Sequence, residues 1–302
     1  MRSFHGAGKC RSYFEGWYFK QQNGRDTVAL IPAFHRDETG KPSASLQILT
    51  DTESGSLSFP AEAFSADRNR LKIRIGDCLF SEQGCRLDAK KDGFEIHGQL
   101  DYGPFRRPKY DMMGPFRYVP FMECRHSVFS LIHSVNGDLV INGKTISFRG
   151  GTGYAEGDRG TSFPGRYLWA QCCRGKESFM VSVADIPFYG NNFVGCLGFW
   201  YQNGKEHRIG TYAGARPLHM DGKKIVLRQG RVLLCIEALE NRGQPLKAPQ
   251  FGNMSRTIHE SAACHVHFHA SDRQKVLFDF ESNQASFESH WEKSDTAQQN
   301  SP

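Results

Sequence analysis

Phe14-Glu15-Gly16-Trp17-Tyr18-Phe19-Lys20 is an aromatic-rich stretch near the start of the chain, and Arg166-Tyr167-Leu168-Trp169-Ala170-Gln171-Cys172 resembles it just past the middle. Each stretch runs into a polar glycine turn and returns as an apolar run, at residues 28–32 and 179–187. Self-similarity at so long a period predicts two copies of one β unit. The simpler interpretation is that an all-β protein contains two unrelated tryptophan-bearing hairpins.

Short strand signals separated by tight turns dominate the rest of the sequence. The chain holds 31 Gly, 23 Phe and 10 Tyr, which fit turns that need positive φ and pleated surfaces that accept aromatic rings. Asn142-Gly143 between two apolar arms is a strong hairpin signal. Few windows show a helical period, so we expect short helices or none. The sequence therefore predicts an all-β fold of two consecutive antiparallel sandwiches or up-and-down barrels.

The repeat also gives a domain organisation. Residues 1–150 are expected to form an N-terminal β domain and residues 151–292 a C-terminal one, followed by a polar, disordered tail at 293–302. Two proline-containing segments, 102–121 and 241–259, are expected to be long loops because proline removes ladder donors. We expect a pocket near the interface of the halves, with the first of these loops as its cap.

Composition narrows the functional class. A formal net charge of +6 without a long basic stripe or a recognisable RNA- or DNA-binding motif argues against nucleic acid as a partner. No stretch approaches the ~18 apolar residues of a membrane span, and Met1 to Cys10 lack the apolar core of a signal peptide. Nine cysteines without CxxC spacing indicate buried thiols in a reducing compartment, so we expect a cytoplasmic protein.

Two acidic residues are candidates for acid catalysis. Glu15 shares a strand face with Trp17, and a carboxyl buried there without partners would stay protonated and could donate a proton. The alternative is that this face is solvated and Glu15 points into water. Glu156 lies in a glycine-flanked segment that we expect to be a loop, together with Tyr154, which could donate a hydrogen bond to a substrate or serve only as a packing plug.

Two histidine-containing segments leave alternatives open. On a strand, His126 would share a face with Met122 and Cys124, where a core role is as reasonable as a functional one. A strand through Cys264 would place three imidazoles on one face, which is half of a zinc site or a solvated surface: His265, His267 and His269. No carboxylate motif nearby in the sequence completes a ligand set, so we assign no metal site.

Six motifs in the same order resemble those of the tocopherol cyclase family, over roughly residues 12 to 290. They are FEGWYFK (14–20), MGPFRYVPFMEC (113–124), GYAE (153–156), GTSFP (160–164), WAQC (169–172) and MSRTIHE (254–260). The chain departs from the family after Glu156, where it carries Gly157 and Arg159. Its compact length is similar to that of the shorter bacterial relatives.

The resemblance implies two consecutive lipocalin-like, calycin-type domains and the acid-catalysed cyclisation of a prenylated quinol, with no cofactor. We expect catalysis by Glu15, Glu156 and Tyr154. Substrate contacts are expected from five residues: Trp17, Tyr118, Glu123, His126 and Trp169. The partner would be a hydrophobic small molecule, which is compatible with transient contact with a membrane surface. The competing hypothesis is a binding protein that holds an isoprenoid or lipid without chemistry.

Overall fold

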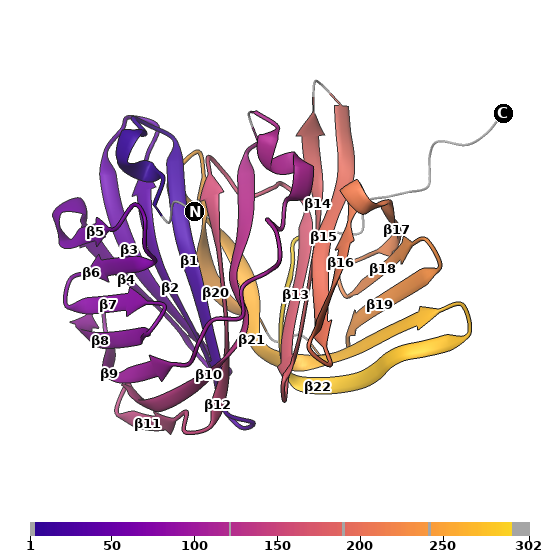
Figure 1. Ribbon diagram of the computed structural model, residues 1–302. Helices are drawn as coiled ribbons and strands as arrows, with labels where there is room; N and C mark the ends of the chain where they lie inside the picture. The colour runs from indigo at the N-terminus through magenta and orange to yellow at the C-terminus, as the bar shows by residue number, and fades with distance from the viewer. Residues whose placement is uncertain (1–3, 121, 189–190, 241–242, 292–302) are drawn as a thin grey trace.

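Two antiparallel sheets make up the computed structural model, which describes residues 4–120, 122–188, 191–240 and 243–291. The sheets lie side by side, and β20 and β21 of the second sheet lie against the first sheet in the middle of the molecule (Figure 1). The described residues contain four short 3-10 helices and no α-helix, so the expected all-β class is confirmed. No helix in this part of the chain has the length and hydropathy that crossing a lipid bilayer requires.

Twelve strands form the first sheet and ten the second. The first comprises β1 (Tyr13–Gln22), β2 (Thr27–Arg36), β3 (Pro42–Thr50), β4 (Ser54–Pro60), β5 (Phe64–Ala66), β6 (Lys72–Ile75), β7 (Cys78–Ser81), β8 (Gly84–Lys91), β9 (Phe94–Tyr102), β10 (Cys124–Ile141), β11 (Lys144–Ser147) and β12 (Gly151–Gly160). The second comprises β13 (Tyr167–Arg174), β14 (Glu177–Phe188), β15 (Asn191–Gln202), β16 (Lys205–Gly210), β17 (Ala215–Met220), β18 (Lys224–Gln229), β19 (Val232–Ala238), β20 (Gln244–Gln250), β21 (Asn253–Asp272) and β22 (Lys275–Ser289). The 3-10 helices are η1 (Gly6–Gly8), η2 (Ala61–Ala63), η3 (Gly114–Tyr118) and η4 (Thr211–Ala213).

The strand order follows one scheme in both sheets. The first sheet reads β4-β3-β2-β1-β12-β10-β9-β8-β7-β6-β5, and the second reads β16-β15-β14-β13-β22-β21-β19-β18-β17. Neither sheet closes into a barrel in the described residues, because β4 and β5 end the first and β16 and β17 end the second. A shared order is what a duplication would leave, and the duplication itself stays a prediction.

The boundary expected at residue 150 falls just before β12. That strand pairs with β1 on one side and β10 on the other, so the first sheet extends to Gly160. The tail expected at residues 293–302 lies outside the described residues.

Each sheet curls around its own apolar core, and a third apolar cluster fills the seam between the sheets. Because side chains alternate across a strand, adjacent residues serve different cores. Cys172 packs in the core of the second sheet and Cys173 in the seam, as their adjacency predicts. The two landmark tryptophans likewise differ, since Trp17 packs in the first core and Trp169 in the seam.

Tyr18, and not Trp17, therefore points into the seam as Trp169 does. The Tyr18 and Trp169 rings meet across the seam with centroids 5.4 Å apart. Tyr18 is opposite Glu156 on β12, and Trp169 is opposite Glu288 on β22. A comparison that aligns the two tryptophans is consequently shifted by an odd number of residues, which reverses the faces of the strand.

Local signals succeeded at one hairpin and failed at another. Asn142 and Gly143 both have positive φ, 48° and 82°, and close the β10–β11 hairpin as predicted. The long loop expected at residues 241–259 is wrong, because β20 and the start of β21 form a hairpin there. β20 tolerates Pro245 and Pro249 because it pairs only with β21, and an edge strand leaves half of its donors unused.

Candidate active site

A cavity of ≈ 190 Å³ lies in the seam, between the faces of the two sheets. Side chains from β1, β2, β10 and β12 form one wall, and side chains from β13, β14 and β20 to β22 form the other. Glu123 and Pro187 are exposed where they line it, so the cavity reaches the surface at that side. Drug-sized ligands usually occupy 300–1,000 Å³, so this space suits the reacting part of a ligand whose remainder extends outward.

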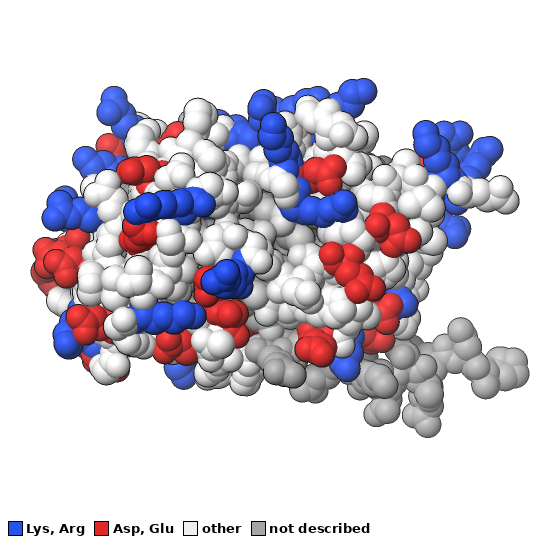
Figure 2. All heavy atoms as spheres, turned by 90° about the horizontal axis from the view of Figure 1, so that it is seen from below, with Lys and Arg blue, Asp and Glu red and all other residues white. Residues whose placement is uncertain are grey.

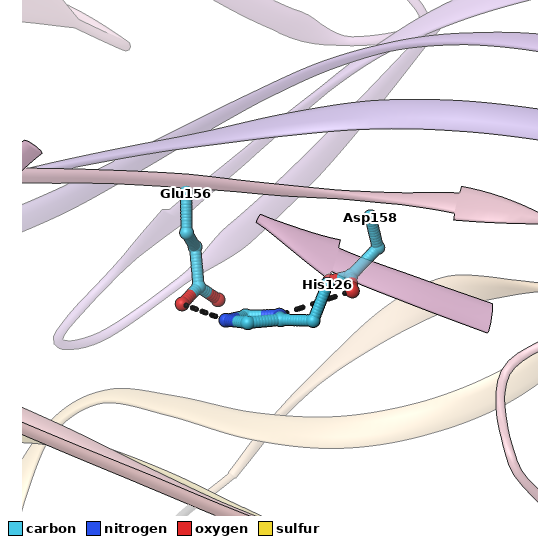
Figure 3. A group of neighbouring side chains, drawn as sticks. All are labelled: His126, Glu156 and Asp158. Carbon is cyan, nitrogen blue, oxygen red and sulfur yellow. Dashed lines mark hydrogen bonds and ion pairs between the residues drawn. The ribbon is translucent and has the colours of Figure 1, made fainter. Parts of the chain in front are cut away.

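His126 is held between two carboxylates on the wall formed by the first sheet (Figure 3). Its Nδ1 lies 3.1 Å from Asp158 Oδ1, and its Nε2 lies 3.2 Å from Glu156 Oε2. The Nε2 contact is close enough for an ion pair, although its angle departs from that of a hydrogen bond. Tyr154 also donates to Glu156 Oε2, at 2.5 Å.

The two carboxylates determine the charge of His126. Burial disfavours its protonated form and is the largest single effect, but Glu156 and Asp158 together outweigh burial and raise the pKa of His126 well above 6.5. The result is a carboxylate–imidazolium–carboxylate cluster. Donor atoms of all three residues lie within 4.8 Å of one another, so the group could hold a divalent cation. A cation would require His126 to leave one carboxylate, because each ring nitrogen faces a different one.

A second pair of acidic residues lies on the opposite wall. Glu260 on β21 and Glu288 on β22 are cross-strand partners, and both side chains are buried. Tyr18 donates to Glu260 Oε1 at 2.6 Å, and Tyr167 donates to Glu288 Oε1. Each carboxyl thus has one oxygen fixed by a phenol, and the other oxygen can carry a proton.

Burial favours the neutral form of both carboxyls. Burial is the main cause that raises the pKa of Glu260 to about 8, with a further increase from Glu156, while the Tyr18 hydrogen bond and Lys20 act in the opposite direction. Burial and the neighbouring Glu260 raise the pKa of Glu288 well above 4.5. Burial therefore acts on both carboxyls, and an ionised Glu260 would further disfavour ionisation of Glu288.

Protein stability should report this protonation. Between about pH 4.5 and about pH 8 the folded state keeps protons on Glu260 that the unfolded chain has released, so the free energy of unfolding falls as pH rises. The slope is about 1.4 kcal/mol per pH unit for each retained proton. Urea unfolding of wild type and Glu260→Gln across this window should show a shallower slope in the variant, and parallel curves would contradict the assignment.

Trp169 contributes an unused donor to the cavity. Its indole Nε1 is buried and has no hydrogen-bond partner among the described residues. Buried donors are rarely left unpaired, so this group is suited to an oxygen of a ligand.

The structure does not bring all predicted catalytic residues together. Glu15 is buried, so the solvated alternative is wrong, but it does not line the cavity. Its carboxylate accepts hydrogen bonds from Tyr13 Oη at 2.7 Å and from the backbone of His5 at 2.8 Å. Glu15 lines a smaller cavity of ≈ 40 Å³ formed by another part of the first sheet.

Other predicted residues lie at different depths. Glu156 and Tyr154 lie on β12 rather than in the expected loop, and Tyr154 is buried behind Glu156 instead of lining the cavity. Trp17, His126 and Trp169 line the cavity, and Glu123 lines it at the exposed side. Tyr118 is 73% exposed on η3 and does not line it.

The three histidines near Cys264 occupy an outer face of β21. His265 Nε2 lies 2.6 Å from Glu281 Oε2, and His267 Nε2 lies 2.6 Å from Asp279 Oδ1. His269 Nδ1 lies 3.3 Å from Asp279 Oδ2. The carboxylates that no nearby sequence motif supplied come from β22, so each imidazole on this face lies beside an acidic side chain.

Three solved structures resemble this architecture over nearly its whole length. An AttH-type protein, NE1406 of Nitrosomonas europaea, matches with a TM-score of 0.54 at 10% identity and covers 92% of both chains. Kievitone hydratase of Nectria haematococca matches with a TM-score of 0.56 at 9% identity, covering 91% of this chain and 89% of its own. CghA, in a structure with Sch210972, matches with a TM-score of 0.58 at 12% identity, covering 93% and 89%.

The chain shares their fold. No family model matches the sequence, and no curated protein matches it by sequence. The likeness to the three structures therefore concerns the path of the backbone, and the chemistry has to be argued from the side chains in the seam.

The glycine at position 157 is explained by close packing, which leaves no room for a side chain. A Cβ at this position would lie 2.6 Å from the backbone oxygen of Gly16 and 2.9 Å from the Phe129 ring. We expect Gly157→Ala to lower the free energy of unfolding by about 1–3 kcal/mol, because a backbone atom cannot yield as a side chain can. Gly165→Ala is the control, since nothing lies within 4 Å of a Cβ there. Equal stability of both variants in urea unfolding would contradict this close packing.

Proposed function

We propose that the chain catalyses the acid-promoted cyclisation of an apolar isoprenoid, of the prenylated quinol type, in the cavity between its two sheets. The observation that carries the proposal is the carboxyl of Glu260, which is buried in the seam, accepts a hydrogen bond from Tyr18 and lines the cavity together with the His126 cluster; its burial raises its pKa to about 8. A positioned carboxylic acid that keeps its proton at neutral pH is what such a reaction needs from a protein.

The proton path can be followed through the named residues. Glu260 gives its proton to an alkene carbon of the prenyl tail, and a tertiary carbocation forms at the other carbon. The phenolic oxygen bonds to this carbocation and releases its own proton. Glu156 on the facing wall is suited to accept that proton and return it to Glu260, while Tyr154 and His126 hold Glu156 in place. Glu15 has no part in this path because it lies outside the cavity.

The remaining lining favours the charged intermediate. The cavity wall is mainly apolar and includes Tyr18 and Trp169, whose rings pack in the seam. Aromatic faces attract cations by about 0.5–2 kcal/mol. The unpaired Nε1 of Trp169 can orient the phenolic oxygen. The carboxylates of Glu156 and Asp158 add electrostatic stabilisation from the opposite side.

Incubation with a panel of prenylated quinols, followed by extraction and chromatography, tests the proposal. The expected product is a chromanol with the mass of the quinol and a different retention time. Recovery of unchanged, bound quinol would overturn catalysis in favour of an isoprenoid carrier. Conversion that disappears after dialysis against a chelator and returns with a divalent cation would assign the His126 cluster to a metal instead of to an ion-paired imidazolium.

A further inference from the structure

The cavity is acidic although the chain as a whole is basic. The formal net charge of the chain is +6. On the face seen in Figure 2, Lys and Arg are interspersed with Asp and Glu over both halves. The cavity differs, because a single lysine, Lys247, lines it together with six acidic side chains: Glu123, Glu156, Asp158, Asp185, Glu260 and Glu288.

The three basic side chains in the lining offer an anion little: two are neutral or already paired, and the third is exposed to solvent. Lys247 is exposed, and its Nζ donates to Thr257 Oγ1 at 3.1 Å. His126 already has a carboxylate on each ring nitrogen. His35 is neutral because burial lowers its pKa to about 4, and it bonds to Ser45 Oγ at 2.8 Å.

We infer that the cavity selects its ligand by charge: it binds an apolar chain with a cationic amine head group most tightly, the neutral alcohol less tightly, and the carboxylate of the same chain weakly. The inference depends on the cavity of the proposed function and extends it by a head-group class. It makes amine-bearing apolar molecules, alongside neutral phenols, the ligands to which this seam is complementary.

The facing acids give the selectivity its physical cause. A bound ammonium group would let Glu260 or Glu288 ionise, because an adjacent positive charge favours a carboxylate in a buried site. An ion pair then replaces a neutral acid and a proton leaves for solvent. A bound carboxylate meets only the exposed Lys247, whose charge solvent screens, and it is repelled by Glu156 and Asp158.

Farnesylamine, farnesol and farnesoic acid form a matched series for titration calorimetry at pH 7, below their aggregation limits. We expect the amine to bind about 10-fold more tightly than the alcohol, and the alcohol about 10-fold more tightly than the acid. Repetition in buffers of different ionisation enthalpy should show release of up to about one proton with the amine and none with the alcohol. Equal affinities, or tighter binding of the acid, would overturn the inference.

Two variants separate the cavity from the surface. Glu260→Gln should bring the amine-to-alcohol affinity ratio close to one and reduce proton release. Glu281→Gln, on the exposed outer face of β22, should leave both quantities at their wild-type values. Asp158→Asn provides a second cavity variant if Glu260→Gln does not fold, and it should strengthen binding of farnesoic acid. A charge series as predicted without quinol conversion would refute the cyclase alone, and conversion without charge selectivity would refute this inference alone.

Discussion

Glu260→Gln is expected to lower the rate of quinol cyclisation by about 10²–10⁴-fold while the protein still binds the quinol. The amide keeps the shape of the side chain and can still accept the hydrogen bond from Tyr18, but it has no acidic proton to transfer to an alkene. The substitution should therefore lower kcat and leave the affinity for the quinol unchanged. Glu281→Gln on the outer face is the matched control and should be as active as wild type.

The pH profile gives the same prediction a second measurement. Because the acid must be protonated, wild-type turnover should fall as pH rises through about 8, the value to which burial raises the pKa of Glu260. A rate that increases with pH, or a Glu260→Gln variant within a few-fold of wild type, would show that another group supplies the proton.

His126→Leu is expected to lower the free energy of unfolding by about 3–5 kcal/mol. The substitution leaves Glu156 and Asp158 without the imidazolium that now lies 3.2 Å and 3.1 Å from them in a mostly buried site. Removing one partner of a buried ion pair is costly because the remaining charge has lost both water and its counterion. Thermal or urea unfolding at pH 7 measures the change.

An exposed pair offers the comparison for this substitution. His219 Nε2 lies 3.1 Å from Asp221 Oδ2, with side chains 53% and 33% exposed. His219→Leu should change the free energy of unfolding by less than about 1 kcal/mol, because solvent screens such pairs. Adding Asp158→Asn to His126→Leu should restore part of the lost stability. Similar small effects at positions 126 and 219 would mean that the His126 cluster is solvated and carries little energy.

Local signals were sufficient for the all-β class and for the β10–β11 hairpin, because residue spacing and turn chemistry act over a few positions. Strand alternation also placed Cys172 and Cys173 correctly on opposite faces. The same rule could not show which face belongs to which core. Trp17 and Trp169 consequently looked equivalent in sequence although they lie on opposite faces of their strands.

The carboxyl pair of Glu260 and Glu288 could not be predicted, because it depends on the register between β21 and β22. That register shifts between Ser261 and Cys264 and again before Val266, so counting from the hairpin turn does not give it. One signal was present, since Glu260 ends the motif MSRTIHE at residues 254–260. Glu288 had no comparable motif.

The surroundings of Glu15 and of the outer histidines could not be predicted from the sequence either, because their partners come from other segments of the chain. Glu15 has the neighbours expected of a catalytic acid, but its partners include His5, which comes from a segment that strand patterns do not describe. The carboxylates beside His265 and His267 come from β22 and are invisible to a search along β21 alone. The partners of both groups are set by contacts between segments far apart in the chain, and the spacing of residues along one strand carries little information about such contacts.

Infrared difference spectroscopy between wild type and Glu260→Gln at pH 7, in deuterated buffer, tests the central claim most directly because it needs no substrate. A neutral carboxylic acid has a carbonyl stretch distinct from the bands of carboxylates and amides. The account predicts such a band in the difference spectrum, where the neutral carboxyl of Glu288 is common to both proteins and cancels, and it predicts that this difference band disappears as pH rises through about 8. A wild-type spectrum at pH 7 in which Glu260 contributes only carboxylate bands would contradict a protonated acid in the seam and, with it, the proposed chemistry.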